Sequence, residues 1–326
     1  MIRQQSKQRF LPVLLTTISL TVASALSSAV PAVPERVLVT GANGRTGQLV
    51  FQSLLEDSRY EPIALVRSEK SGKKLRKTVP ETDLNQIVVC DVSSSEETQT
   101  MLDNPPNAIE GCKSMVICTS AVPAVSKLSL VKAFLKIPFN LIRRKKAVDF
   151  RSLKFVWKNG GYPEKVDYEG QVAQIDMCKK LGIKQVVVVS SMGGTDPENF
   201  LNKVGKNPDG SGNGDILLWK RKAEKYLVDS DDLDYMIIHP GGLVDKPAGE
   251  ENLVLDVDDK LMKNTKRSIS RADVAKLCVA ALSLGKGKKV SLDCITRAPE
   301  GDEKLRTAEE ALSDYLKEAK VYDYSR

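Results

Sequence analysis

Three glycines, Gly41, Gly44 and Gly47, recur at every third position between a β-branched run and a segment with helical periodicity. Glycine allows a tight turn and a close approach of the backbone to a ligand, and the first turn of the following helix offers unpaired N–H groups to a phosphate. The pattern therefore predicts a dinucleotide cofactor whose pyrophosphate lies over this loop. The polar loop residues that would join the glycines are Asn43, Arg45 and Thr46.

The end of the second predicted strand indicates which nicotinamide cofactor binds. An Asp or Glu there would bind the 2′-hydroxyl of the adenosine ribose, whereas an Arg accommodates a 2′-phosphate. This strand ends in Arg67, and we expect Arg45 of the glycine loop to reach the same side. The sequence therefore predicts NADP(H) rather than NAD(H). The alternative is that Arg67 is an ordinary solvated residue at a strand end.

Two further strand ends should complete the cofactor site. Asp91 and Val92 end the third predicted strand and would lie at the adenine. Thr119, Ser120 and Ala121 end the fourth strand and would lie under the nicotinamide ribose. These positions follow because ligands of open α/β sheets bind at the carboxyl ends of the strands.

The spacing GxxGxxG, in place of GxGxxG, resembles that of extended and atypical short-chain dehydrogenases/reductases (SDRs). Several runs resemble the NAD(P)H-binding atypical SDRs of plant and algal plastids, which are similar to the nucleotide-binding part of the chloroplast import component Tic62. The resemblance covers about residues 36–300 and implies NADP(H) binding on a Rossmann fold related to biliverdin and flavin reductases. It also places Pro240 and Gly241 at the cofactor. The matching runs outside the glycine loop are Ser120-Ala121-Val122-Pro123, Tyr162-Pro163-Glu164, Val166-Asp167, Gly170-Gln171, residues 189–195, residues 219–224, Pro240-Gly241-Gly242-Leu243 and residues 271–275.

Hydride transfer in SDRs uses a Tyr whose phenol is made acidic by a Lys four residues later, with a Ser that orients the substrate carbonyl. Lys222 occupies the place of this lysine, and the residue four earlier is Leu218, which can donate no proton. Ser190 and Ser191 end the fifth strand, where the family's Ser belongs. We therefore predict Lys222 and Ser191 as the catalytic residues, with Lys222 also binding the nicotinamide ribose. The alternative for Lys222 is a solvated helix lysine. In this family the Tyr is typically absent, so the fold alone implies no reaction.

The chain contains a single histidine, His239, which excludes a metal site built on two imidazoles, so we predict no metal. Relatives tend to carry Arg at this place, before the Pro-Gly-Gly turn. His239 is therefore either a proton donor or a partly buried residue at a strand end.

The elements that must position these residues alternate between short β-branched runs and amphipathic segments. This alternation predicts an α/β Rossmann fold, a doubly wound parallel sheet with helices on both faces and a small C-terminal region on the substrate side. We expect one domain over residues 35–326. The predicted strands are residues 37–40, 62–67, 87–91, 114–119, 186–190, 235–239 and 289–294, and the predicted helices are residues 46–55, 96–102, 168–181, 217–230, 271–284 and 308–319.

The net charge of +7 over 326 residues is unevenly distributed. Residues 125–158 carry +9 and residues 1–34 carry +3, which leaves −5 for the remainder. The basic insertion, residues 124–158, holds an apolar stripe between Leu128 and Ile137, then Pro138, which should break the helix, and then the run Arg143-Arg144-Lys145-Lys146. This combination favours peripheral contact with an anionic membrane or an acidic protein. The alternative is a lid helix packed on the body, and we expect no nucleic-acid binding because the body is acidic.

Residues 1–34 begin with basic residues, continue with an apolar run and end in the small residues Ala23-Ser24-Ala25, as a cleaved signal sequence does. The six cysteines are widely spaced without a CxxC motif, which indicates reduced core thiols rather than a disulfide framework. The signal-like segment implies entry into the secretory pathway, whereas reduced thiols imply a reducing final compartment. A plastid that is reached through the secretory pathway would meet both conditions. Simple secretion is the alternative.

Two function classes remain open. The first is a plastid NADPH-dependent oxidoreductase that acts on an unknown small molecule. The second is a non-catalytic NADP(H)-sensing or assembly protein that docks on a membrane or complex through the basic insertion, and the absence of a Tyr at residue 218 favours it.

Overall fold

The computed structural model describes residues 33–135, 137, 155–157, 160–207 and 209–325. From Pro34 onward the chain forms one compact unit. Two predicted features lie outside the described residues: the presequence up to residue 32, and the stretch that holds Pro138 and the basic run Arg143–Lys146.

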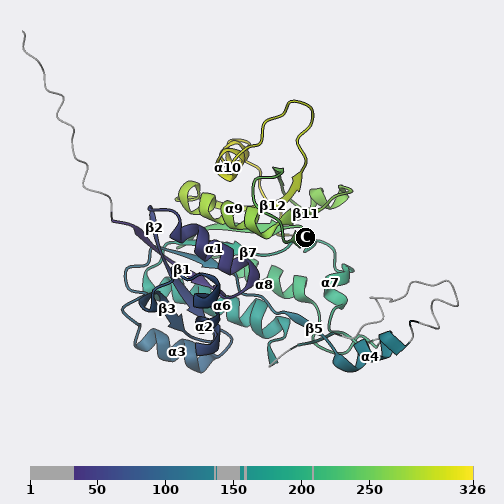
Figure 1. The fold of residues 1–326 in the computed structure, drawn as a ribbon, viewed down its shortest axis with the longest axis horizontal. Helices are drawn as coiled ribbons and strands as arrows, with labels where there is room; N and C mark the ends of the chain where they lie inside the picture. Colours follow the sequence, from purple (N-terminus) through teal and green to yellow (C-terminus); the bar gives the residue numbers. More distant parts are fainter. Residues whose placement is uncertain (1–32, 136, 138–154, 158–159, 208, 326) are drawn as a thin grey trace, which may run out of the picture. The chain divides into compact units, whose positions relative to one another are not determined.

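An eight-stranded sheet forms the centre of this unit, in the order β10-β12-β8-β7-β4-β1-β2-β3 (Figure 1). Its strands are parallel except for β10, which runs antiparallel to β12. The chain order reverses at β1, with β2 on one side and β4 on the other, and such a switch point is where α/β sheets bind ligands. The strands are β1 (Glu35–Thr40), β2 (Tyr60–Val66), β3 (Ile87–Val89), β4 (Ser114–Ile117), β7 (Gln185–Val189), β8 (Asp234–Pro240), β10 (Asn252–Asp256) and β12 (Lys289–Arg297).

Helices cover both faces of the sheet because successive strand residues point to opposite sides. In β1, Val37 and Val39 belong to the core on one face and Leu38 to the core on the other. The first face is covered by α1 (Arg45–Leu55), α2 (Glu69–Thr78), α9 (Arg271–Leu284) and α10 (Ala308–Lys317). The second is covered by α3 (Ser95–Asp103), α6 (Gly170–Leu181) and α8 (Ile216–Val228). Figure 1 shows α9 and α10 on one side of the sheet and α6 and α8 on the other. The predicted Rossmann fold is confirmed.

The seven predicted strands and six predicted helices are all present, with ends that differ by a few residues. The sequence pattern did not predict α2, whose ten residues bury only Gly72 and Leu75 and are otherwise mostly charged. It also missed β10 and the small pair of β9 (Gly242–Val244) with β11 (Ser268–Ser270). The prediction of reduced thiols is confirmed, since all six cysteines are free and five of them are buried.

The basic insertion contains a short hairpin and a helix. β5 (Pro123–Val125) pairs antiparallel with β6 (Phe155–Trp157), and α4 (Lys127–Leu135) lies between them in the chain. The apolar stripe predicted from residue 128 is thus helical as far as the structure describes it. Among the described residues, no helix combines the length and the apolar character that a membrane crossing requires.

Candidate functional site

The glycine loop lies at the carboxyl end of β1 and is packed too tightly for side chains. Gly41 has a φ of +64°, and a Cβ there would lie 2.9 Å from the carbonyl carbon and oxygen of Cys118. A Cβ on Gly47 would lie 2.4 Å from the carbonyl oxygen of Gly41, and one on Gly44 would lie 3.0 Å from the same atom. The three glycines therefore allow the loop to fold against the end of β4.

This loop fits the pyrophosphate of a dinucleotide. Gly44 caps α1 without any side-chain hydrogen bond, so the N–H groups of the first helical turn have no intrahelical acceptor and no side-chain cap. Oδ1 of Asn43 is buried without a hydrogen-bond partner. Unpaired donors and an unpaired acceptor beside a side-chain-free loop are what a bound dinucleotide would satisfy.

The two arginines that the sequence predicts at the 2′-phosphate of NADP(H) have different surroundings. Arg67 is exposed directly after β2, where a 2′-phosphate would lie. Arg45 instead pairs with Asp245, which follows β9 and also accepts a 2.7 Å hydrogen bond from Arg271. This differs from the expectation that Arg45 reaches the same side as Arg67, because Asp245 follows β9, which comes directly after β8, and β8 and β2 lie on opposite sides of β1 in the sheet. The pair is weak, since its side chains are 66% and 62% exposed.

Next to Asp91 and Val92, where the sequence predicts the adenine of the cofactor, the structure has a cavity. Oδ1 of Asp91 accepts hydrogen bonds from the backbone N–H and the hydroxyl of Ser93, which fixes the turn after β3. Val92 lines a cavity of about 340 Å³ between this turn and the start of α6, together with Glu96 and Lys165. The cavity lies where the sequence predicts the adenine.

A buried ion pair stands at the end of β4, next to the glycine loop. Nζ of Lys220 lies 2.8 Å from Oδ1 of Asp167, and the two side chains are 7% and 0% exposed. Oδ2 of Asp167 accepts a 3.0 Å hydrogen bond from the backbone N–H of Ala121. Burial raises the pKa of the Cys118 thiol to about 12, and the nearby Lys220 ammonium lowers it in part. Lys220 is therefore the charged group that adjoins the loop at residues 118–121.

The other two residues predicted here differ in their surroundings. The Thr119 hydroxyl accepts a 3.0 Å hydrogen bond from Nε2 of Gln174 on α6, so it is held toward that helix. Ser120 is exposed at the edge. Only Ala121, through its backbone, is tied to the buried ion pair.

The structure places Lys222 and Lys220 in different surroundings. Lys222 lies on the exposed side of α8 beside Leu218, and its ammonium is 4.1 Å from the ring centroid of Trp219. Lys220, two residues earlier, faces the interior, where it pairs with Asp167. The residue four before Lys220 is Ile216, so the position of the SDR tyrosine again holds no proton donor. The inward face of α8 could have been found from its periodicity, because the buried residues are Leu217, Lys220, Arg221, Ala223, Glu224 and Leu227.

The two serines after β7 have separate roles. Ser190 is buried, and its hydroxyl donates to the carboxylate of Glu224. Ser191 is half-buried, and its hydroxyl donates a 3.1 Å hydrogen bond to the carbonyl of Met192. Both serines directly follow β7 (Gln185–Val189), at the carboxyl end of the strand. Pro240 ends β8, and a Cβ on the next residue, Gly241, would lie 2.3 Å from the carbonyl oxygen of Arg267.

His239 belongs to a buried charge network behind the site. The imidazole is 1% exposed, with Nε2 3.2 Å from Glu224 Oε2 and Nδ1 3.3 Å from Asp293 Oδ1. Burial opposes its protonation, but the attraction of Glu224 and then of Asp293 outweighs burial and raises the pKa of His239 to about 9. The interpretation as a buried histidine is therefore confirmed, and the residue has no exposed atom with which to reach a substrate directly.

The elevated pKa of His239 predicts a stability that depends on pH. The folded pKa of about 9 lies above the ordinary value of 6.5, so the protonated imidazole stabilises the fold fully below about pH 6.5. That contribution is lost as the pH rises through about 9, at a cost on the order of 1–3 kcal/mol. Urea unfolding across this range should show the loss in the wild type and a flatter profile in His239→Gln. An equal slope in both proteins would contradict the assignment.

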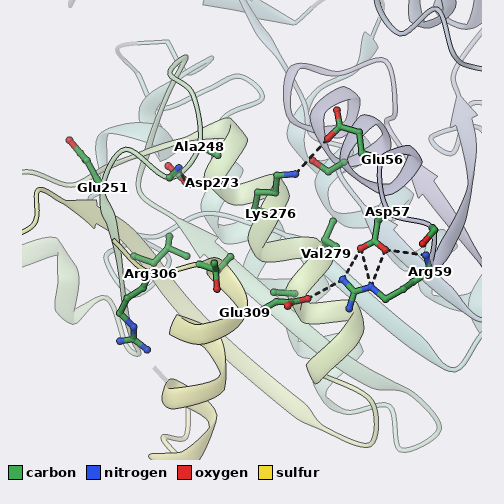
Figure 2. Close-up of a pocket in the computed structure, with 17 residues that line it drawn as sticks. Glu56, Asp57, Arg59, Ala248, Glu251, Asp273, Lys276, Val279, Arg306 and Glu309 are labelled. Atoms are coloured by element: carbon green, nitrogen blue, oxygen red, sulfur yellow. Dashed lines mark hydrogen bonds and ion pairs between the residues drawn. The ribbon is translucent and has the colours of Figure 1, made fainter. Parts of the chain in front are cut away.

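A separate groove of about 600 Å³ lies between the end of α1, the outer side of α9 and the start of α10 (Figure 2). Its charged groups mostly pair with one another, as Arg59 does with Asp57 and Glu309 and Lys276 does with Glu56. None of the residues predicted to bind cofactor lines it. The groove is therefore distinct from the cofactor site.

The parallel sheet, the glycine loop at its switch point and the buried lysine beside it define a Rossmann-type nicotinamide-dinucleotide-binding protein. A family model described as NAD(P)H-binding matches residues 41–284, so the chain belongs to the NAD(P)H-binding family. The predicted resemblance to NAD(P)H-binding proteins of plastids is confirmed.

Two relatives and one solved structure show the range of this similarity. An uncharacterised chloroplastic protein of Arabidopsis thaliana is 38% identical over 281 residues, which covers 86% of this chain and 75% of that protein. Sanguinarine reductase of Eschscholzia californica is 38% identical over 270 residues, covering 81% and 90%. A solved structure from Bacillus halodurans, provisionally described as a NAD-dependent epimerase/dehydratase, has a TM-score of 0.55 at 21% identity. The match covers 86% of this chain and 99% of the other, and it supports the fold alone.

Proposed function

We propose that the protein is an NADPH-dependent reductase of a small organic molecule. The observation that carries this proposal is the buried pair of Lys220 and Asp167 at the end of β4, beside the glycine loop. Taking a pair of charges out of water costs free energy of desolvation, so a buried pair is weak evidence for stability and is better explained by a positioning role. Here it holds one ammonium group where a nicotinamide ribose would lie.

Each residue has a defined task in this scheme. The bound cofactor would supply the hydride. Lys220 donates hydrogen bonds to the ribose hydroxyls, and Asp167 fixes the direction of its ammonium group. Ser191 orients the substrate from the end of β7. The proton that a carbonyl substrate would require comes from solvent, because Ile216 stands four residues before Lys220 in place of a tyrosine.

The relatives support a reductase in a plastid. Sanguinarine reductase carries the activity in its name and matches over nearly its whole length, and the Arabidopsis relative is named chloroplastic. We propose that residues 1–34 direct the chain to a plastid through the secretory pathway. A fluorescent protein fused after residue 34 should accumulate in plastids, whereas accumulation outside the cell would favour simple secretion.

The cofactor part of the proposal is tested by titration calorimetry on the full chain. We expect NADPH to bind in the micromolar range. Failure to bind NADPH or NADH at such concentrations would exclude the reductase and the sensing role together.

Arg67→Asp should reverse the choice of cofactor. Hydrogen bonds to a charged group contribute roughly 1.5–3 kcal/mol, so the Kd for NADPH should rise about 10- to 100-fold while that for NADH changes little. Arg76→Asp, at an equally exposed position on α2, is the matched control and should leave both values unchanged. If Arg67→Asp retains the NADPH preference, Arg67 does not read the 2′-phosphate.

A non-catalytic NADP(H)-sensing or assembly role is the second candidate. It is favoured by Ile216, which leaves the site without the proton donor of the SDR mechanism. The two roles separate experimentally: a protein that binds NADPH but never oxidises it with carbonyl, iminium or quinone compounds is a sensor.

A further inference from the structure

The basic insertion presents an apolar surface that the described part of the chain does not cover. On α4, Leu130, Val131, Phe134 and Leu135 are between 39% and 73% exposed. These positions are spaced by one and four residues, so they share one face of the helix. The lid interpretation required this stripe to be packed on the body, and the exposure of all four side chains contradicts it.

The hairpin beside α4 extends this apolar surface. Val122 is 72% exposed, and Val125 on β5 and Val156 on β6 are also exposed. Figure 1 shows β5 and α4 together at the margin of the folded unit. Contiguous apolar patches of this kind on a protein surface mark sites of interaction.

The charge of the same stretch of sequence identifies the partner. Residues 125–158 contain ten Lys or Arg and the single acidic residue Asp149, whereas the remainder of the chain beyond residue 34 is acidic. An apolar helix face joined to a dense basic segment suits a bilayer with anionic headgroups, because the apolar side chains enter the acyl boundary and each basic residue is attracted to the surface. A protein groove would satisfy the apolar face but would not require so many basic residues in the same stretch of sequence.

We propose that the apolar face of α4 and the hairpin dock the protein on an anionic lipid membrane. Docking there brings the cofactor site close to the bilayer, because Ala121, which binds Asp167, is separated from β5 by the single residue Val122. The proposal does not depend on whether hydride transfer occurs.

Co-sedimentation of the full chain with phosphatidylcholine vesicles, with and without phosphatidylglycerol, tests the proposal. We expect binding to the anionic vesicles only, weakened by salt. Neutralising Arg143, Arg144, Lys145 and Lys146 with Gln should lower the affinity on the order of 1,000-fold. The matched control neutralises four exposed bases of α2, namely Lys73, Lys74, Arg76 and Lys77, and should retain most of the binding.

A second pair of variants tests the apolar face. Phe134→Ser with Leu135→Ser should weaken vesicle binding at least about tenfold. The control changes another exposed Phe-Leu pair, Phe200 and Leu201, to Ser. Unchanged NADPH affinity in all four variants verifies that each is folded.

Three results would overturn the proposal. They are equal binding to neutral and anionic vesicles, equal losses in a variant and its control, and no vesicle binding at all. Residues 1–34 are present in every variant. If these residues alone bound the membrane, each variant and its control would show the same vesicle affinity, which is the second of the three results.

Discussion

NADPH affinity should fall about 10- to 100-fold when Lys220→Met is combined with Asp167→Asn, because charge-assisted hydrogen bonds to the ribose are lost. The double change is needed because Met alone would leave Asp167 buried and uncompensated, which destabilises a fold by about 3–5 kcal/mol. Asn can still accept the hydrogen bond from the N–H of Ala121. Calorimetry with NADPH measures the effect, and any reductase activity should fall with it.

Lys222→Met is the control for this experiment, since it removes the same charge from the same helix two residues away. The ammonium of Lys222 lies over the rings of Trp219 and Tyr168 in an exposed setting, so its loss should alter affinity by less than about twofold. If Lys222→Met abolishes binding and the Lys220 variant does not, the assignment made from the sequence was right and the structural one is wrong.

Gly47→Ala should remove cofactor binding while leaving most of the fold intact. The added Cβ would lie 2.4 Å from the carbonyl oxygen of Gly41, so the first turn of α1 must move away from Gly41. We expect at least about a tenfold rise in the Kd for NADPH and a loss of about 1–3 kcal/mol in the free energy of unfolding, as overpacking commonly costs. Calorimetry and urea unfolding measure the two quantities.

Gly242→Ala is the matched control, because its Cβ would lie an ordinary 3.6 Å from the carbonyl of Arg267. It should affect neither binding nor stability strongly. Normal NADPH binding by Gly47→Ala would show that the cofactor does not lie over this loop.

Local sequence patterns predicted the strands of the parallel sheet and the glycine loop because both depend on neighbouring residues. β-branched runs form buried strands, and glycines at a strand-to-helix turn permit a phosphate site. The pattern failed at β10, a half-exposed edge strand, and at α2, where charge hides the helical periodicity.

The site was harder to predict because its partners are distant in the chain. Asp167 meets Lys220 across 53 residues, and Arg45 meets Asp245 across 200, so no local pattern reveals either pair. Motif spacing alone predicts Lys222, rather than Lys220, as the lysine of the SDR motif. The hydrophobic face of α8 would have decided between them, since only Lys220 lies on the side with Leu217 and Leu227.

Residues 322–324, near the C-terminus, pack against α8, the helix that carries Lys220. Arg221, the neighbour of Lys220, donates a 2.6 Å hydrogen bond to the carbonyl of Asp323 and lies 5.0 and 4.1 Å from the ring centroids of Tyr322 and Tyr324.

This attachment has a consequence for biosynthesis. Arg221 precedes the aromatic residues that cover it by about a hundred residues. The packing on this side of α8 is therefore completed only after residues 322–324 have been synthesised.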